Sequence, residues 1–104
     1  MDRIPHQIDL ATAKTMIAAA KAKTPTAPNA WWFDREILDV ILAQKDVTGL
    51  RIYIGATQEG AMQPILVGTT GEGATGSDLA EGVIGEEALP CPTFCDKNSP
   101  LGPA

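Results

Sequence analysis

The chain has 104 residues, of which 44% are hydrophobic and 20% charged, values typical of one small globular domain. Enough apolar surface is present to offset the entropy of ordering, so disorder of the whole chain is not expected. The formal net charge is −5, and the excess lies after Gly71, where six acids accompany a single lysine. Because such a surface repels phosphates and anionic lipids, we expect no nucleic-acid binding and no membrane binding.

The residues from Met1 to His6 lead into no long apolar run, which argues against a secretory signal. Apolar stretches elsewhere are only a few residues long, too short to span a bilayer. We therefore expect a cytoplasmic protein, in which the two cysteines would stay reduced.

Two helices are predicted in the first half of the chain. The first covers residues 10–23, with Asp9 as its N-cap and apolar residues at helical spacing. The second runs from Arg35 to about Gln44, with Asp34 as its N-cap and a broad apolar surface.

The aromatic run Trp31-Trp32-Phe33 stands directly before the second helix. One interpretation is an aromatic platform for a ligand. The other is packing at the start of the helix, with Phe33 placed against Leu38 as a hydrophobic staple. The second interpretation is favoured, because aromatic rings contribute most to burial.

Two strands follow, over residues 50–55 and 64–70, joined by a turn signal at residues 58–60. We expect them to form an antiparallel hairpin covered on one face by both helices. Apolar and polar residues alternate along the first strand, which indicates one buried and one wetter face. Arg51 and Tyr53 share the wetter face, where they could bind an anionic group or a partner protein, or pair with surface acids.

A two-stranded hairpin is marginal in water, so something else must complete the sheet. The candidates are a third short strand around Val83 and Ile84, or the matching edge of a second chain. Residues 71–104 are rich in glycine and proline, and we expect an irregular acidic tail with one helical turn at residues 77–81. The predicted fold is a single α+β domain, with a helix-helix-hairpin core over residues 1–70.

The glycines at residues 71–76 match the G-x-G-x-x-G pattern of dinucleotide-binding turns. The context does not fit, because no parallel second strand follows and Glu72 would oppose a bound phosphate. We interpret the segment as a glycine-rich loop.

Cys91 and Cys95 form the sequence C-P-T-F-C, with three residues between the cysteines. They could be structural thiols, a short disulfide in an oxidising setting, zinc ligands or a redox pair. A closed zinc site needs four ligands, which a two-fold dimer would provide with two cysteines from each chain. No neighbouring base activates either thiol, so the redox interpretation is the weakest.

No catalytic set is apparent in the sequence. His6 is the only histidine and is expected to lie on the surface, with nothing to position it for catalysis. Glu86 and Glu87 are adjacent and are interpreted as part of a solvated acidic loop.

The strand Gly49-Leu50-Arg51-Ile52-Tyr53, the segment Leu66-Val67-Gly68 and the C-P-x-x-C ending at Cys95 resemble a group of small uncharacterised bacterial proteins. In that group an aromatic residue precedes a helix, followed by a G-L-R-I-Y-type strand, a V-L-V-G-type strand and the cysteine motif. The present chain has Thr93 where many of those sequences have a second proline. The resemblance implies a shared architecture and no activity.

The incomplete sheet and the lack of a catalytic set favour a non-enzymatic module that self-associates through the sheet edge, as a homo-oligomer, or binds another protein. One alternative is a small metal-binding or thiol-switch protein using Cys91 and Cys95. A further alternative is a small enzyme whose site forms between subunits around Arg51 and Tyr53.

Overall fold

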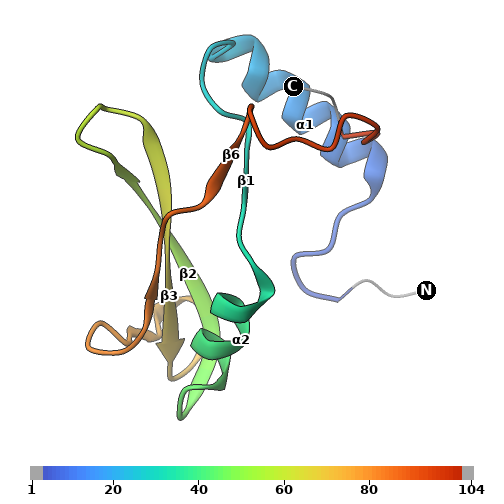
Figure 1. The fold of residues 1–104 in the computed structure, drawn as a ribbon. Helices are drawn as coiled ribbons and strands as arrows, with labels where there is room; N and C mark the ends of the chain where they lie inside the picture. Colours follow the sequence, from blue (N-terminus) through green and yellow to red (C-terminus); the bar gives the residue numbers. More distant parts are fainter. Residues whose placement is uncertain (1–3, 102–104) are drawn as a thin grey trace. The chain divides into compact units, whose positions relative to one another are not determined.

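The computed structural model of the protein describes residues 4–101 (Figure 1). The described elements are two α-helices, one 3₁₀ turn and six strands. In chain order they are α1 (Leu10–Lys23), β1 (Ala30–Trp32), α2 (Arg35–Ala43), β2 (Val47–Ala56), β3 (Met62–Thr70), a 3₁₀ turn (Gly73–Thr75), β4 (Ser77–Asp78), β5 (Ile84–Gly85) and β6 (Leu89–Cys91). The protein is of the mixed α+β class with antiparallel pairing, as predicted, but it has more strands than a hairpin.

The described residues divide into two compact units. One consists of the residues up to Ala30 together with those from Pro90 onward, and the other is Trp31–Leu89. The second unit contains α2 and the four-stranded sheet, whereas α1 and the two cysteines belong to the first. Strands β1 and β6 pair with each other as a separate two-stranded sheet. The single domain expected over residues 1–104 stays a prediction.

Both helices begin at the aspartates predicted as N-caps. The side chain of Asp9 accepts a hydrogen bond from the backbone nitrogen of Thr12 at 2.8 Å. The side chain of Asp34 accepts one from the backbone nitrogen of Glu36 at 3.1 Å. These bonds satisfy backbone donors that have no partner inside a helix, which is why short polar side chains define the two starts.

The predicted hairpin is formed by β2 and β3, which pair antiparallel with Ile52 opposite Leu66. Its loop closes where the backbone nitrogen of Thr57 donates to the carbonyl oxygen of Ala61 at 2.8 Å. Gly60 has a φ of 90°, a conformation that favours glycine, so the turn signal at this position is confirmed. Strand β2 starts at Val47, three residues earlier than predicted, with a register irregularity before Gly49.

The expectation of an irregular segment after residue 70 is wrong for β4, whereas the third strand offered as one way to complete the sheet is present as β5. Strand β4 pairs with the C-terminal end of β3, in place of the expected helical turn at residues 77–81. Strand β5 pairs with the middle of β3, with Ile84 opposite Val67, and provides the third strand predicted around Val83 and Ile84. Two-residue strands carry almost no local signal, and the free edge of β3 is what holds them in extended form.

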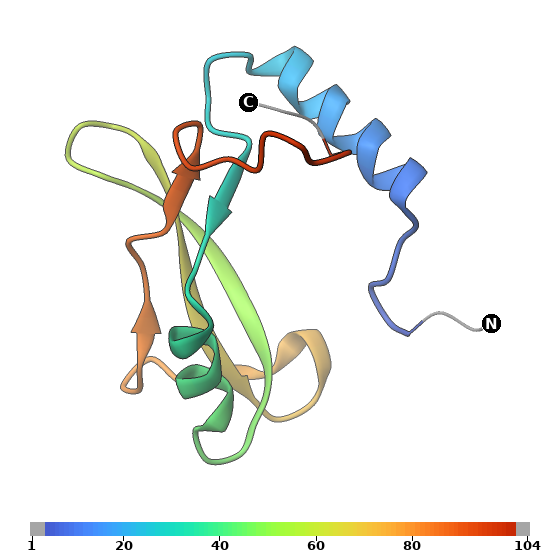
Figure 2. The same cartoon turned by 45° about the vertical axis from the view of Figure 1, so that its right-hand side comes forward.

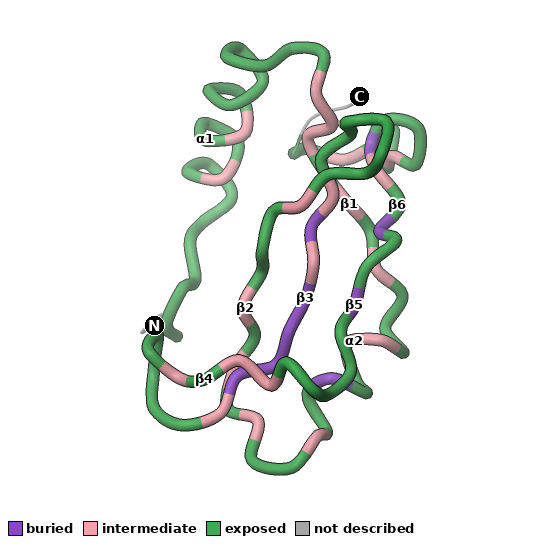
Figure 3. The backbone as a smooth tube through the Cα atoms, turned by 90° about the vertical axis from the view of Figure 1, so that its left-hand side faces the viewer, coloured by how far each residue is buried: buried purple, intermediate pink, exposed green. Residues whose placement is uncertain are grey.

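Strand β3 is therefore the central strand of the sheet. It carries a run of buried residues from Leu66 to Thr69, and Figure 3 shows this run between the largely exposed traces of β2 and β5. One edge of β3 pairs with β2 and the other with β4 and β5. Strand β2 has β3 on one side and, among the described residues, no strand on its other side.

Helix α2 packs on one face of this sheet (Figure 2). Its residue Ile41 is fully buried, and it reaches the sheet where glycines leave room. A Cβ atom on Gly85 would lie 3.0 Å from Ile37 and 3.3 Å from Ile41, so any side chain there would push the helix away. We expected both helices to cover the hairpin. In the unit that contains the hairpin the covering helix is α2, while α1 belongs to the other unit and has no buried residue.

Candidate interaction surface

The apolar row of β2 lies on the same sheet face as α2 but is largely uncovered. Leu50, Ile52 and Ile54 stand opposite Gly68, Leu66 and Pro64 of β3. Their exposed fractions are 37%, 57% and 60%. The sequence predicted this to be the buried face. Helix α2 has only nine residues, about 13 Å of helix, and although it contacts β2 as well as β3 and β5, it leaves most of this row exposed.

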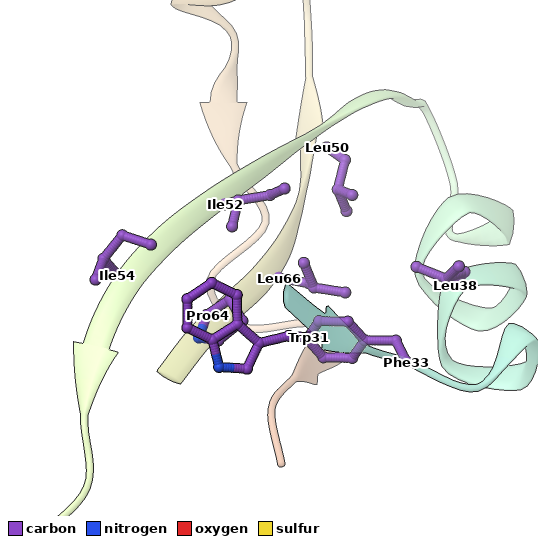
Figure 4. A pocket seen from close by; sticks show the side chains of 8 residues that line it. All are labelled: Trp31, Phe33, Leu38, Leu50, Ile52, Ile54, Pro64 and Leu66. Atoms are coloured by element: carbon purple, nitrogen blue, oxygen red, sulfur yellow. The ribbon is translucent and has the colours of Figure 1, made fainter. Parts of the chain in front are cut away.

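A pocket of about 500 Å³ opens between this row and α2 (Figure 4). Every side chain that lines it is apolar, and the lining comes from the segment before α2, from α2 itself and from both hairpin strands. The lining residues are Trp31, Phe33, Leu38, Leu50, Ile52, Ile54, Pro64 and Leu66. The pocket offers no charged or hydrogen-bonding side chain except through the Trp31 indole, so it suits apolar groups.

The aromatic run before α2 is divided between the pocket and the surface. Phe33 lines the pocket with Leu38, in agreement with the predicted packing at the helix start. Trp31 lines it as well, whereas Trp32 is 55% exposed. The Nε1 atom of Trp31 is enclosed without a hydrogen-bond partner among the described residues, so apolar contact alone holds this ring.

The opposite sheet face holds a polar cluster of Arg51, Tyr53 and Asp78. The Nη1 atom of Arg51 donates to Asp78 Oδ1, and the phenol of Tyr53 donates to Asp78 Oδ2. Both nitrogens at the end of Arg51 also bond backbone carbonyls, with 3.1 Å to Gly76 and 2.6 Å to Ala74. The sequence left open whether Arg51 and Tyr53 bind an anionic group, bind a partner protein or pair with an acid of the chain. In the structure both pair with Asp78. The cluster ties β2 to β4 across β3.

The cluster shifts the ionisation of two of its members. The hydrogen bond from Tyr53, followed by the bond and charge of Arg51, holds the pKa of Asp78 below its ordinary value of 3.8, while burial opposes this. The same bond to Asp78, followed by burial, raises the pKa of Tyr53 above its ordinary value of 10.0. Both shifts favour an ionised Asp78 that accepts from a neutral Tyr53.

The glycine-rich segment at residues 71–76 supplies hydrogen-bond acceptors to this cluster. Its carbonyl oxygens at Ala74 and Gly76 face the Arg51 guanidinium. The carbonyl of Gly71 accepts from the Thr48 hydroxyl at 2.8 Å. Gly71 and Gly73 have φ values of 89° and 61°, which glycine adopts readily. The segment therefore presents acceptors to an arginine, in keeping with its interpretation as a loop.

Cys91 and Cys95 are joined by a disulfide bond. Of the alternatives raised by their spacing, this is the one in the structure, and in this state neither sulfur can bind zinc as a thiolate. Within residues 4–101, no group of three or more His, Cys, Asp and Glu side chains is placed to hold a metal ion. His6, Glu86 and Glu87 are exposed.

Comparison of the chain with known protein families, with curated proteins and with solved structures finds no match. Among the helices in the described part of the chain, none is long and apolar enough to cross a membrane.

The replacement Tyr53→Phe tests the cluster through the pH dependence of stability. A depressed pKa at Asp78 stabilises the folded state above pH 3.8, and this contribution is lost as the pH falls through the lowered pKa. A raised pKa at Tyr53 stabilises it below pH 10.0, and this contribution is lost as the pH rises through the raised pKa. We therefore expect the stability gap between the natural protein and the variant to be widest between about pH 5 and 9.

Urea unfolding measured at a series of pH values checks this expectation. The variant keeps the aromatic ring and loses only the hydroxyl. If the stability difference came from packing alone, it would not change with pH. A constant gap from about pH 3 to 11 would contradict the hydrogen bond between Tyr53 and Asp78.

Proposed function

We propose that the protein is a non-enzymatic assembly module that self-associates through the outer edge of β2. The observation that carries the proposal is a ten-residue strand with one edge that no strand of residues 4–101 pairs with, next to an exposed apolar row on one of its faces. An unpaired edge presents a row of backbone donors and acceptors that pair readily with another strand.

Strand β2 lacks most of the features by which proteins protect such edges. It contains no proline and no lysine. Its one charged side chain, Arg51, is bonded to Asp78 and to two carbonyls on the face away from the apolar row. The register irregularity lies at one end, between Val47 and Gly49, and leaves the remainder of the strand regular.

The apolar row adds a driving force to the pairing of backbones. Removing apolar surface from water contributes roughly 25 cal/mol per Å². Ile52 and Ile54 are both more than half exposed and flank the pocket, so a strand placed beside β2 would cover part of each. A second copy offers the same apolar row and the same free edge, which makes it a complementary partner.

Charge does not drive the association. Between Trp31 and Leu89 there are ten acids and three bases, so two copies of this unit repel each other at long range. Salt screens that repulsion, and the contact itself is built from backbone groups and apolar side chains. The same acidity supports the proposal that the protein binds neither nucleic acid nor anionic membranes.

Replacement of Ile54 by lysine tests the proposal. Lysine on an edge strand blocks pairing because its charge would have to leave water. We expect the dissociation constant for self-association of Ile54→Lys to rise at least about ten-fold. Sedimentation equilibrium over a range of protein concentrations measures this constant.

The matched control is Val40→Lys, since Val40 is an exposed aliphatic residue on α2, outside the pocket lining. We expect it to associate like the natural protein. A natural protein that remains a monomer at all concentrations up to about 1 mM, an affinity weaker than about −4 kcal/mol, would refute the proposal.

A second candidate function, a thiol switch, is favoured by the disulfide between Cys91 and Cys95. The bond holds a short loop, and the Cys91 carbonyl in this loop accepts from the backbone nitrogen of Asn29 at 2.9 Å. The cytoplasm proposed from the sequence would reduce this bond, whereas an oxidising compartment would preserve it. Zinc binding remains a proposal for the reduced form only.

Trapping of thiols in living cells, followed by mass measurement, distinguishes these states. We expect a switch to give a mixture that moves toward the reduced form when a reductant is added, with two modified cysteines per chain in that form. A disulfide that stays intact under every condition would identify a structural bond and remove this candidate.

A further inference from the structure

The register of the paired edges can be deduced from the sequence of β2. Two antiparallel edge strands related by a two-fold axis perpendicular to the sheet keep their side chains on matching faces. The axis must then pass beside one residue, which stands opposite its own copy, and residues at equal distances on either side stand opposite each other. The candidates near the middle of β2 are Arg51, Ile52 and Tyr53.

An axis at Arg51 brings two guanidinium groups directly opposite each other, and like charges in that position destabilise a sheet. It also leaves Ile54 opposite Thr48 of the partner subunit. An axis at Tyr53 pairs the two phenol rings but leaves Leu50 opposite Ala56 of the partner subunit. The register at Arg51 therefore leaves Ile54 opposite a polar side chain, and the register at Tyr53 leaves Leu50 opposite only a methyl group.

An axis at Ile52 has neither defect. It places Ile52 opposite the partner's Ile52, and Leu50 opposite the partner's Ile54, so all three residues of the row meet a large aliphatic side chain. On the other face Arg51 stands opposite the partner's Tyr53, and an arginine beside an aromatic ring is a favourable pair. The ends of the paired segment bring Gly49 opposite the partner's Gly55, where no side chains interfere.

We infer that two copies of the chain join their β2 edges about a two-fold axis at Ile52, so that each copy completes the apolar pocket of the other. This inference rests on the proposed self-association. Three lining residues of the pocket, Leu50, Ile52 and Ile54, belong to β2. Neighbouring strands lie about 4.8 Å apart, so the partner's Leu50 and Ile54 extend the pocket wall across the axis.

A cysteine in place of Ile52 tests the register. Directly opposite residues in antiparallel strands have Cα atoms about 4.5–5.5 Å apart, within the range that a disulfide spans. We expect Ile52→Cys to form a covalent dimer under mild oxidation. The natural cysteines are already bonded to each other and do not compete.

The matched control is Ile54→Cys. In the inferred register the two copies of this residue are four positions apart along the strands, about 13 Å, and cannot be bridged. We expect at least about ten-fold less covalent dimer from Ile54→Cys alone than from an equal mixture of Ile54→Cys with Leu50→Cys. The mixture reports the same register without altering Ile52.

The outcomes separate the register from the association. One outcome is that mass measurement shows dimers in which Ile54→Cys alone, or Tyr53→Cys, is the variant that cross-links. That result would overturn the inferred register and leave the proposed association intact. If the protein is dimeric but none of these cysteine variants or mixtures forms a covalent dimer, the inferred register is overturned as well. A natural protein that stays monomeric would overturn both the register and the proposed function.

Discussion

The central constraint in this protein is the pairing of backbone groups along its hairpin. Every buried N–H and C=O group must find a partner, and a strand between two others meets that requirement on both sides. The protein meets it for the C-terminal half of β3, from Leu66 to Thr70, by placing β5 and β4 along the second edge of that strand. It provides no such strand for β2 among residues 4–101. Because of this asymmetry between the two strands, the unpaired backbone groups are concentrated along the outer edge of β2.

The same asymmetry explains the exposed apolar row. Helix α2 sits over the side of the sheet where Gly68 and Gly85 leave space for Ile41. A nine-residue helix covers only part of β2, so much of the row of Leu50, Ile52 and Ile54 remains exposed. An open edge and an uncovered apolar face therefore occur on one strand, and a second chain could relieve both at once. The pocket between them is a consequence of this incomplete cover.

Local chemistry made part of the fold predictable. Asp9 and Asp34 bond to backbone nitrogens two or three residues away, so the sequence around each helix start contains the information needed. The hairpin is also local, since its turn and alternation are adjacent in sequence. These elements were predicted with only small errors in their ends.

The remainder depends on contacts between distant residues. The partner of Arg51 is Asp78, 27 positions away, so the sequence left open whether the arginine binds an acid of its own chain. Strands β4 and β5 are two residues long and exist because β3 offers an edge. The sequence did not predict the pocket, because the pocket depends on how far α2 extends over the sheet. The cysteine spacing fits several chemistries equally, and only the three-dimensional structure pairs Cys91 with Cys95.

Hydrogen exchange of the β2 amides tests the account most directly, because it reports the pairing of individual backbone groups. The account predicts that the β3 amides that face β2, β4 or β5 are protected at every protein concentration. The β2 amides that point away from β3 should gain protection only at concentrations where dimers form. Outward β2 amides that are protected in the dilute monomer, or that stay unprotected in the dimer, would contradict it.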